Sequence, residues 1–420
     1  MDNTKSTGQI TGKITANPNP VGFGQRCVIS WNTNDPAGAE IRVSTGSNDE
    51  KLVTRGEKSG DVEIPWITDA TEYEFRLYAA SRPDAPLDSV KARRQIEAAP
   101  NALREIADEV TRGNIDVMEL SQFVATVLPR CLRSERFREI FSFWEQHGFH
   151  VTPVHFYQPI PDTQSLPEAL WDRPSELVGI DMNDAMQLDL LRNQFPKFRH
   201  EYEQWVTEPT SDSGRFYLRK RPFGGTDALV AYCMVRHFQS RLIIEVGSGY
   251  SSLVLAEAAS KTDTSLICIE PFPSDFLSKG FPCLKALVAK KVQEIDLDFF
   301  SQLGAGDILF IDSSHTVKIG GDVNYLFLEV LPRLKPGVIV HVHDIFLPFD
   351  YRRDWVMEEF RFWAEQYLLQ AFLIFNSEFE VLLANRYVAH RYMEQFKATF
   401  PTSPGWAGGS FWMRRKPLAN

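Results

Sequence analysis

The sequence lacks the features that mark a disulfide-stapled protein or a nucleic-acid-binding protein. Its five cysteines are scattered, odd in number and without a C-x-x-C pair. This pattern argues against a disulfide framework or a zinc site and fits a reducing compartment. The formal net charge is −10, whereas nucleic-acid binding usually needs a basic face. We therefore expect no nucleic-acid partner.

Long hydrophobic runs are also missing. A membrane-spanning helix needs a run of about 18 apolar residues, and none occurs in the chain. Met1–Lys5 begins no apolar signal region, so we expect no membrane partner and a cytoplasmic location. The composition is that of a globular protein, with 43% hydrophobic and 24% charged residues. The length of 420 residues predicts two to three domains.

Residues 10–96 alternate apolar and polar side chains with period two. Short runs of this kind are separated by turn residues, which predicts a β-sandwich. Trp31 is expected in its core, and the prolines of Pro83–Pro100 suggest a linker. The strand rhythm, the early Trp and the late Tyr-x-Phe-x-Leu-Tyr strand resemble immunoglobulin-like or fibronectin-type modules. The expected strands are Cys27–Trp31, Glu40–Ser44, Asp61–Ile64 and Tyr73–Tyr78.

Helical periodicity takes over in residues 101–148. We interpret this stretch as a small connector that packs on the next domain. Residues 151–175 are Pro-rich and irregular, which predicts a surface loop or a substrate-side flap. Further helices are expected at Asp184–Phe195, Phe198–Val206 and Ala228–Gln239, the last with Thr226 or Asp227 as its N-cap.

From Arg241 onward strands and helices alternate, which predicts a mostly parallel seven-stranded sheet covered on both faces. The expected strands are Leu242–Val246, Ser265–Glu270, Val292–Ile295, Asp307–Asp312, Val338–His343, Ala371–Phe375 and Ser410–Arg414. The expected helices cover 251–260, 282–290, 321–334 and 354–369. The predicted organisation is a β-sandwich over 1–97, a helical linker and substrate-side segment over 98–223, and an α/β Rossmann-like domain over 224–420.

The first strand of this α/β domain runs into Glu245-x-Gly247-x-Gly249 and then into a helix-forming stretch. A nucleotide-like ligand docks at such a turn, at the carboxyl ends of the strands. We expect Gly247 and Gly249 to adopt positive φ and let the ligand approach the backbone, and Ser251 or Ser252 to cap the helix. Glu245 can anchor a cationic or amino group of the ligand, directly or through water. The third glycine of a dinucleotide fingerprint is missing, which disfavours an NAD-dependent enzyme.

Polar residues also end the following strands. Glu270 lies about 20 residues after the glycines, where an acid can accept hydrogen bonds from ribose hydroxyls. The fourth strand ends in Asp312 with His315 shortly after it, and the fifth ends in His343-Asp344. Asp312, His343 and Asp344 could hold a divalent cation. The alternative is a hydrogen-bonded polar cluster without metal.

Residues from about 224 to 415 resemble class I S-adenosylmethionine-dependent methyltransferases. The cofactor signature consists of the turn and of the acid at the end of the second strand. The resemblance to a bacterial methyltransferase-domain group comes from the stretches FIDSSH and HVHDIF. The lead-in FYQPIPDT extends this resemblance to near residue 150. The resemblance implies S-adenosylmethionine as the cofactor. The residues expected to bind it are Glu245, Gly247, Gly249 and Ser251 around its methionine part, Glu270 at the ribose, Asp296 near the adenine, and Asp312 where the donor faces the acceptor.

Some relatives, such as catechol-type and macrolide-sugar O-methyltransferases, bind magnesium. They use an acid after the fourth strand and a consecutive acid/amide or acid/acid pair after the fifth. Asp312 and His343-Asp344 fall at those positions, which implies Mg, Mn or Zn. His343 replaces an oxygen ligand, so a softer metal than magnesium, or none, stays open.

Methyl transfer to a hydroxyl needs alignment of donor and acceptor and a group that removes the proton. His315 and His343 are the candidate catalytic bases, because an imidazole pKa suits neutral pH, and a metal can assist instead. We expect O-methylation of a small-molecule or glycan-type acceptor. Tyr351–Trp355 could form part of a lid over it, in which Arg352 and Arg353 meet an anionic substrate.

Two other functional classes stay open. One is a non-catalytic binding or scaffold protein, in which the β-sandwich does the work. The other is a metal-dependent oxygenase or hydrolase, because fold alone does not settle chemistry. For the β-sandwich we expect a role in partner docking, in homo-oligomer formation or in recognition of a larger substrate such as a glycan.

Overall fold

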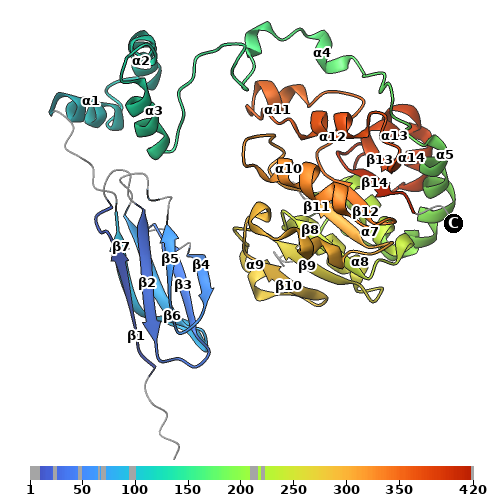
Figure 1. Ribbon diagram of the computed structural model, residues 1–420, viewed down its shortest axis with the longest axis horizontal. Helices are drawn as coiled ribbons and strands as arrows, with labels where there is room; N and C mark the ends of the chain where they lie inside the picture. Colours follow the sequence, from blue (N-terminus) through green and yellow to red (C-terminus); the bar gives the residue numbers. More distant parts are fainter. Residues whose placement is uncertain are drawn as a thin grey trace, which may run out of the picture. The chain divides into compact units, whose positions relative to one another are not determined.

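The computed structural model describes residues 10–21, 26–45, 50–64, 67, 72–93, 101–208, 216–218 and 223–417. The chain divides into two units, Met1–Pro159 and Ile160–Asn420 (Figure 1). Residues 160–208 therefore belong to the same unit as the α/β domain, and the boundary expected at residue 97 lies outside the described residues. None of the described helices is long and apolar enough to cross a membrane.

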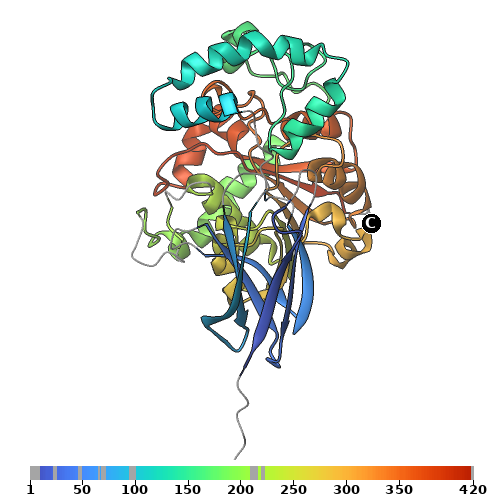
Figure 2. The same cartoon turned by 90° about the vertical axis from the view of Figure 1, so that its left-hand side faces the viewer.

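Two antiparallel sheets make up the strand region of the first unit, drawn in blue in Figures 1 and 2. Alternate side chains of both sheets face a shared apolar core that includes Ile29, Trp31 and Phe75. This sandwich is compatible with the immunoglobulin- or fibronectin-like architecture expected from the sequence. One sheet contains β1 (Gly12–Asn17), β2 (Cys27–Thr33) and β5 (Ser59–Ile64), and the other contains β4 (Lys51–Gly56), β3 (Ala39–Ser44), β6 (Tyr73–Ala79) and β7 (Arg82–Ala92).

The interpretation of Pro83–Pro100 as a linker is wrong for its first part. Pro83 and Pro86 lie in β7, which pairs with β6 at the edge of the four-stranded sheet. A proline lacks the N–H that an inner strand donates on both sides, so it is tolerated at an edge. Residues 94–100 of the expected linker lie outside the described part of the chain.

Three helices follow in the first unit, as the periodicity predicts. They are α1 (Asn101–Thr111), α2 (Val117–Leu132) and α3 (Phe137–Gln146). Asp116 caps α2 by accepting hydrogen bonds from the backbone N–H groups of Met118 and Glu119. Neither α2 nor α3 has a buried side chain, and the expected packing of this segment on the next domain stays a prediction.

The second unit is built on a seven-stranded sheet in the order β10-β9-β8-β11-β12-β14-β13. All neighbours pair in parallel except β14, which is antiparallel to both β12 and β13. The strand order reverses between β8 and β11, the place where open α/β sheets bind ligands at the carboxyl ends of their strands. The strands are β8 (Leu242–Val246), β9 (Ser265–Ile269), β10 (Leu284–Val288), β11 (Ile308–Ile311), β12 (Ile339–Val342), β13 (Phe379–Ala384) and β14 (Phe411–Arg415).

Helices cover both faces of this sheet (Figure 1). One face packs against α7 (Gly225–Phe238), α8 (Tyr250–Ala259), α13 (Asn385–Arg391) and α14 (Met393–Thr399). The other face packs against α10 (Asp322–Tyr325), the helical turns that continue it to Arg333, and α12 (Glu365–Leu373). The remaining helices of the unit are α4 (Ala169–Asp172), α5 (Asp184–Asp189), α6 (Arg199–Tyr202), α9 (Asp275–Lys279) and α11 (Arg353–Met357).

One helix prediction and two strand predictions in this unit are wrong. The helix expected at 282–290 is strand β10, and the strand expected at Val292–Ile295 begins with a 3-10 turn, Val292–Glu294. The strand expected at Ala371–Phe375 is largely the end of α12, and the strand is β13 further on. Short apolar runs fit either period, so pairing with neighbours in the sheet decides the outcome.

The helix expected at 354–369 is broken into α11 and α12. Phe360, between them, has a φ of 55°, outside the helical range, so the chain turns there. The expected N-caps are also displaced: α7 is capped at Gly224 and α8 at Gly249. Thr226 and Asp227 lie inside the first turn of α7, and their side chains bind elsewhere.

Candidate functional site

The turn after β8 packs directly on the end of β11. Gly247 has a φ of 82°, and a Cβ there would overlap the carbonyl oxygen of Asp312. The backbone N–H of Asp312 donates to Val246 O at 2.9 Å. A glycine is therefore required at 247, as expected. The expectation of positive φ at Gly249 is wrong, since its φ is −171°. The space beside Gly249 is open, because a Cβ there would meet nothing within 4 Å.

Glu245 lies behind this turn with no exposed surface. Its carboxylate accepts hydrogen bonds from Ser251 Oγ at 2.7 Å, Ser252 Oγ at 2.5 Å and Cys268 Sγ at 3.4 Å. Burial raises the pKa of Glu245 to about 7, although the two serine hydroxyls oppose that rise. The geometry gives Glu245 and Ser251 a role in holding the end of β8 to the start of α8. Direct binding of the cofactor by either side chain stays a prediction.

Glu270 follows β9 at the same edge of the sheet. It is partly buried, which raises its pKa, and its Oε1 accepts a hydrogen bond from the backbone N–H of Phe272 at 2.9 Å. The Phe272 side chain is 77% exposed. The sequence motifs did not point to Phe272, whose only signal is an aromatic residue two positions beyond the acid expected to bind ribose.

Asp296 lies further from its strand than expected. The third strand of the domain ends at Val288, so Asp296 comes eight residues later and begins the 3-10 turn Leu297–Gln302. Its side chain is exposed. The role of Asp296 near the adenine stays a prediction.

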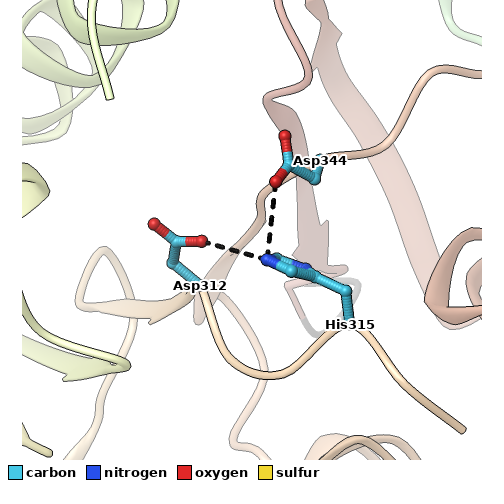
Figure 3. Close-up of side chains that lie close together, drawn as sticks. All are labelled: Asp312, His315 and Asp344. Carbon is cyan, nitrogen blue, oxygen red and sulfur yellow. Dashed lines mark ion pairs between the residues drawn. The ribbon is translucent and has the colours of Figure 1, made fainter. Parts of the chain in front are cut away.

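Asp312, His315 and Asp344 lie together where β11 and β12 end (Figure 3). His315 Nε2 is 3.4 Å from Asp312 Oδ1 and 3.5 Å from Asp344 Oδ2. One ligand atom from each residue lies within 4.8 Å of the other two, which is room for one metal ion. His315, expected only as a base, thus joins the two carboxylates of the expected cation group, and the role of His343 as a ligand stays a prediction.

Two residues of this group have an unusual backbone. His315 has a φ of 57° and Asp344 a φ of 55°. Positive φ is uncommon for residues other than glycine and costs of order 1–3 kcal/mol unless the surroundings hold it. Such residues gather at functional sites, which supports a functional role for the group.

His343 also lies against both carboxylates of this group, and its Nδ1 is 3.7 Å from Asp344 Oδ1. Its Nδ1 is 3.2 Å from Asp312 Oδ1, its Nε2 is 3.6 Å from Asp227 Oδ2, and its ring packs on Phe223 at 5.0 Å between centroids. The sequence reasoning did not consider Asp227 as part of the site. Its buried carboxylate accepts hydrogen bonds from the backbone of Ser410 at 2.8 Å and from Asn385 Nδ2 at 2.8 Å, and so fastens the chain that enters β14.

The surrounding carboxylates favour the charged form of both imidazoles by raising their pKa. Burial disfavours the charged form of His315, but Asp312 and Glu365 outweigh burial and raise the pKa of His315 to about 10. For His343 burial is likewise outweighed, by Asp344 and Asp312, and its pKa lies well above the usual value. An imidazolium has no free lone pair, so neither histidine can accept a proton in this state.

The stretch expected to form a lid packs beside His315. Its aromatic cluster contains Phe346, Tyr351 and Trp355 together with Trp171 and Trp363, and the Trp363 ring lies 4.4 Å from the His315 ring. Because Trp171 comes from the Pro-rich segment before α5, this segment and the stretch after β12 form one wall next to His315.

The two lid arginines already have carboxylate partners. Arg352 lies 2.5 Å from Asp354, and Arg353 lies 3.0 Å from Glu168. Their expected role toward an anionic substrate stays a prediction, and these ion pairs would have to open for it.

Comparison with known proteins identifies the second unit. Residues 244–345 match the family model described as a methyltransferase domain. A protein from Archaeoglobus fulgidus, described only as uncharacterized, is 30% identical over 161 residues, which cover 36% of this chain and 72% of that protein. The chain belongs to the methyltransferase-domain family, as its motifs predict.

A solved structure adds a weaker likeness. It is the crystal structure of a presumed methyltransferase from Thermobifida fusca YX, with 12% identity and a TM-score of 0.25. The match covers 61% of this chain and 100% of that chain.

Proposed function

We propose that this protein is an S-adenosylmethionine-dependent methyltransferase that methylates an oxygen of a small-molecule or glycan-type acceptor. The observation that carries the proposal is the packing of Gly247 on the backbone of Asp312. This contact puts the turn that would hold the cofactor next to the group of Asp312, His315 and Asp344. Methyl transfer needs its two reactants aligned at close range, and this arrangement supplies neighbouring positions for them.

The residues around the turn fit the cofactor. Gly249 faces open space, so a ligand can lie against the backbone there. Glu270 can accept hydrogen bonds from ribose hydroxyls, and the exposed ring of Phe272 offers an apolar surface beside it. When bound, S-adenosylmethionine supplies a methyl group from a positively charged sulfonium.

The acceptor hydroxyl must lose its proton, and the raised pKa of His315 and His343 favours their charged form, which cannot accept it. Among the acids of the group, the pKa of Asp312 is lowered, although its burial raises it, because His343 and His315 stabilise its charge. Burial raises the pKa of Asp344. In this charge state Asp344 is the better proton acceptor of the two carboxylates.

A divalent cation is a second way to activate the hydroxyl. Two carboxylates and one imidazole from Asp312, His315 and Asp344 suit Mg, Mn or Zn. When bound, such a cation lowers the pKa of a coordinated hydroxyl. Binding would displace the proton from His315 Nε2, since a histidine ligand must be neutral.

Calorimetry with S-adenosylhomocysteine tests the proposal. Gly249→Val fills the open space at the turn, so we expect at least about tenfold weaker binding with an unchanged melting temperature. Gly56→Val is the matched control, because a Cβ at Gly56 also meets nothing within 4 Å and this residue lies in strand β4 of the first unit. If the wild-type protein does not bind S-adenosylhomocysteine, the proposed function is wrong.

A further inference from the structure

His315 is held in place from α12, a helix that begins 50 residues further along the chain. Its backbone carbonyl accepts hydrogen bonds from the N–H groups of Ala364 at 3.0 Å and Glu365 at 3.1 Å. Its ring nitrogen Nδ1 lies 2.8 Å from Glu365 Oε2. The first residues of α12 thus hold both the backbone and the side chain of His315.

These contacts explain how His315 keeps its unusual conformation. A residue with a φ of 57° needs surrounding structure that over-determines it, and the two N–H groups at the start of α12 provide it. Such N–H groups have no partner inside a helix and are free to bind elsewhere. The side-chain bond then selects the ring orientation: with Nδ1 turned to Glu365, Nε2 faces Asp312 and Asp344.

The His315 ring is the side-chain partner of Glu365 among the described residues. The Glu365 side chain has no exposed surface, and its Oε1 has no hydrogen-bond partner among the described residues. A buried carboxylate with an unsatisfied oxygen is costly. A glutamine could accept the same hydrogen bond from Nδ1 without a buried charge. An acid differs from a glutamine at this position because its charge can pair with a positively charged His315 ring.

We propose that Glu365 is the positioning residue of this site: it holds the His315 imidazole so that Nε2 faces the gap between Asp312 and Asp344, ready to bind a divalent cation. A carboxylate behind a metal-binding histidine fixes its tautomer and orientation and makes the ring a stronger ligand. The part of this inference that concerns the cation rests on the proposed function, whereas the orientation of the ring does not.

Titration of the full chain with Mn²⁺ alone and Zn²⁺ alone, followed by calorimetry, measures the effect. We expect Glu365→Gln to weaken cation binding by about 10–100-fold without a lower melting temperature. Glu358→Gln is the matched control, because it makes the same chemical change at an exposed position before α12. If Glu365→Gln fails to fold, Glu365→Asp takes its place, because it keeps the charge but shortens the side chain by one methylene. Glu365→Asp must then show the weaker cation binding.

The outcomes separate this inference from the proposed function. Unchanged cation affinity in a folded Glu365 variant overturns the inference. Loss of S-adenosylhomocysteine binding together with cation binding shows general damage to the unit and also overturns it. If the wild-type protein binds neither ion, the cation part of the proposed function fails. The orientation is then read from a crystal structure of Glu365→Gln: a turned His315 ring supports the positioning role, and an unmoved ring overturns it.

Discussion

Single buried acids determine much of the local chemistry of the second unit. Glu245 shows this most clearly, because it joins two elements and has no exposed surface. Its partners Ser251 and Ser252 are neutral, and their hydrogen bonds offset only part of the cost of burying its charge. The carboxyl group therefore holds its proton to about pH 7, well above its ordinary pKa of 4.5.

This shift predicts a pH-dependent stability. A group whose pKa is raised in the folded state stabilises the protein below its unfolded pKa, and this contribution is lost as the pH rises through the folded pKa. For Glu245 the window runs from about pH 4.5 to about pH 7. The loss is on the order of 3 kcal/mol, from about 1.4 kcal/mol per unit of pKa.

Glu245→Gln removes this titration. We expect the free energy of unfolding of Glu245→Gln, relative to wild type, to increase between pH 5 and pH 8, because only the wild type has to ionise a buried acid. Urea unfolding at several pH values measures the difference. Glu257→Gln is the control, since Glu257 is exposed on α8 and should follow wild type. Parallel curves for Glu245→Gln and wild type would contradict the prediction.

At the level of elements, the break between α11 and α12 shapes the site. A continuous helix over 354–369 would leave no free N–H groups at residue 365, whereas the start of α12 there directs two of them to His315. The break depends on Phe360, which has a φ of 55° and a side chain that is 66% exposed. An exposed bulky residue in this conformation contributes little packing and carries backbone strain.

Substitutions at Phe360 test this conformation. Glycine adopts positive φ freely, so Phe360→Gly should be more stable than Phe360→Ala by about 1 kcal/mol. The order should reverse inside a helix, where glycine is worse than alanine by about 1 kcal/mol. Glu257→Gly and Glu257→Ala in α8 provide that comparison. Thermal unfolding of the four variants gives both differences, and a more stable Phe360→Ala would rule out the break as described.

For the whole molecule, the candidate site belongs to one unit. Every residue considered for the cofactor or the cation, from Asp227 to Glu365, lies in Ile160–Asn420. This unit has its own large apolar clusters on both faces of its sheet, which is the usual condition for folding alone. The first unit contributes no residue to the candidate site as described.

A protein shortened to residues 160–420 should therefore still bind S-adenosylhomocysteine, with an affinity within about threefold of the full chain. Calorimetry on both forms makes the comparison. A folded short form with no affinity would show that the first unit completes the site. The first unit's roles in docking, oligomer formation and substrate recognition stay predictions. Comparing the assembly state of the short form with that of the full chain tests the prediction of oligomer formation.

The sequence was sufficient for the family, the mostly parallel seven-stranded sheet and the turn of Glu245, Gly247 and Gly249. These features depend on neighbours in the chain: an apolar strand, an acid and glycines in fixed order are visible without knowing what they pack on. Strand positions such as β10 were missed for the converse reason, because a short apolar run becomes a strand only when another strand lies beside it.

Only the tertiary structure decided how the acids and histidines are grouped. The sequence predicted His343 as the imidazole of the group, because it ends the fifth strand next to the fourth strand's Asp312. Positive φ at His315 and Asp344 turns these residues toward one another, and Glu365, far along the chain, fixes the ring. Contacts across such separations depend on how elements pack. For this reason the sequence could name the donor turn but could not show that His315, besides His343, faces the two carboxylates.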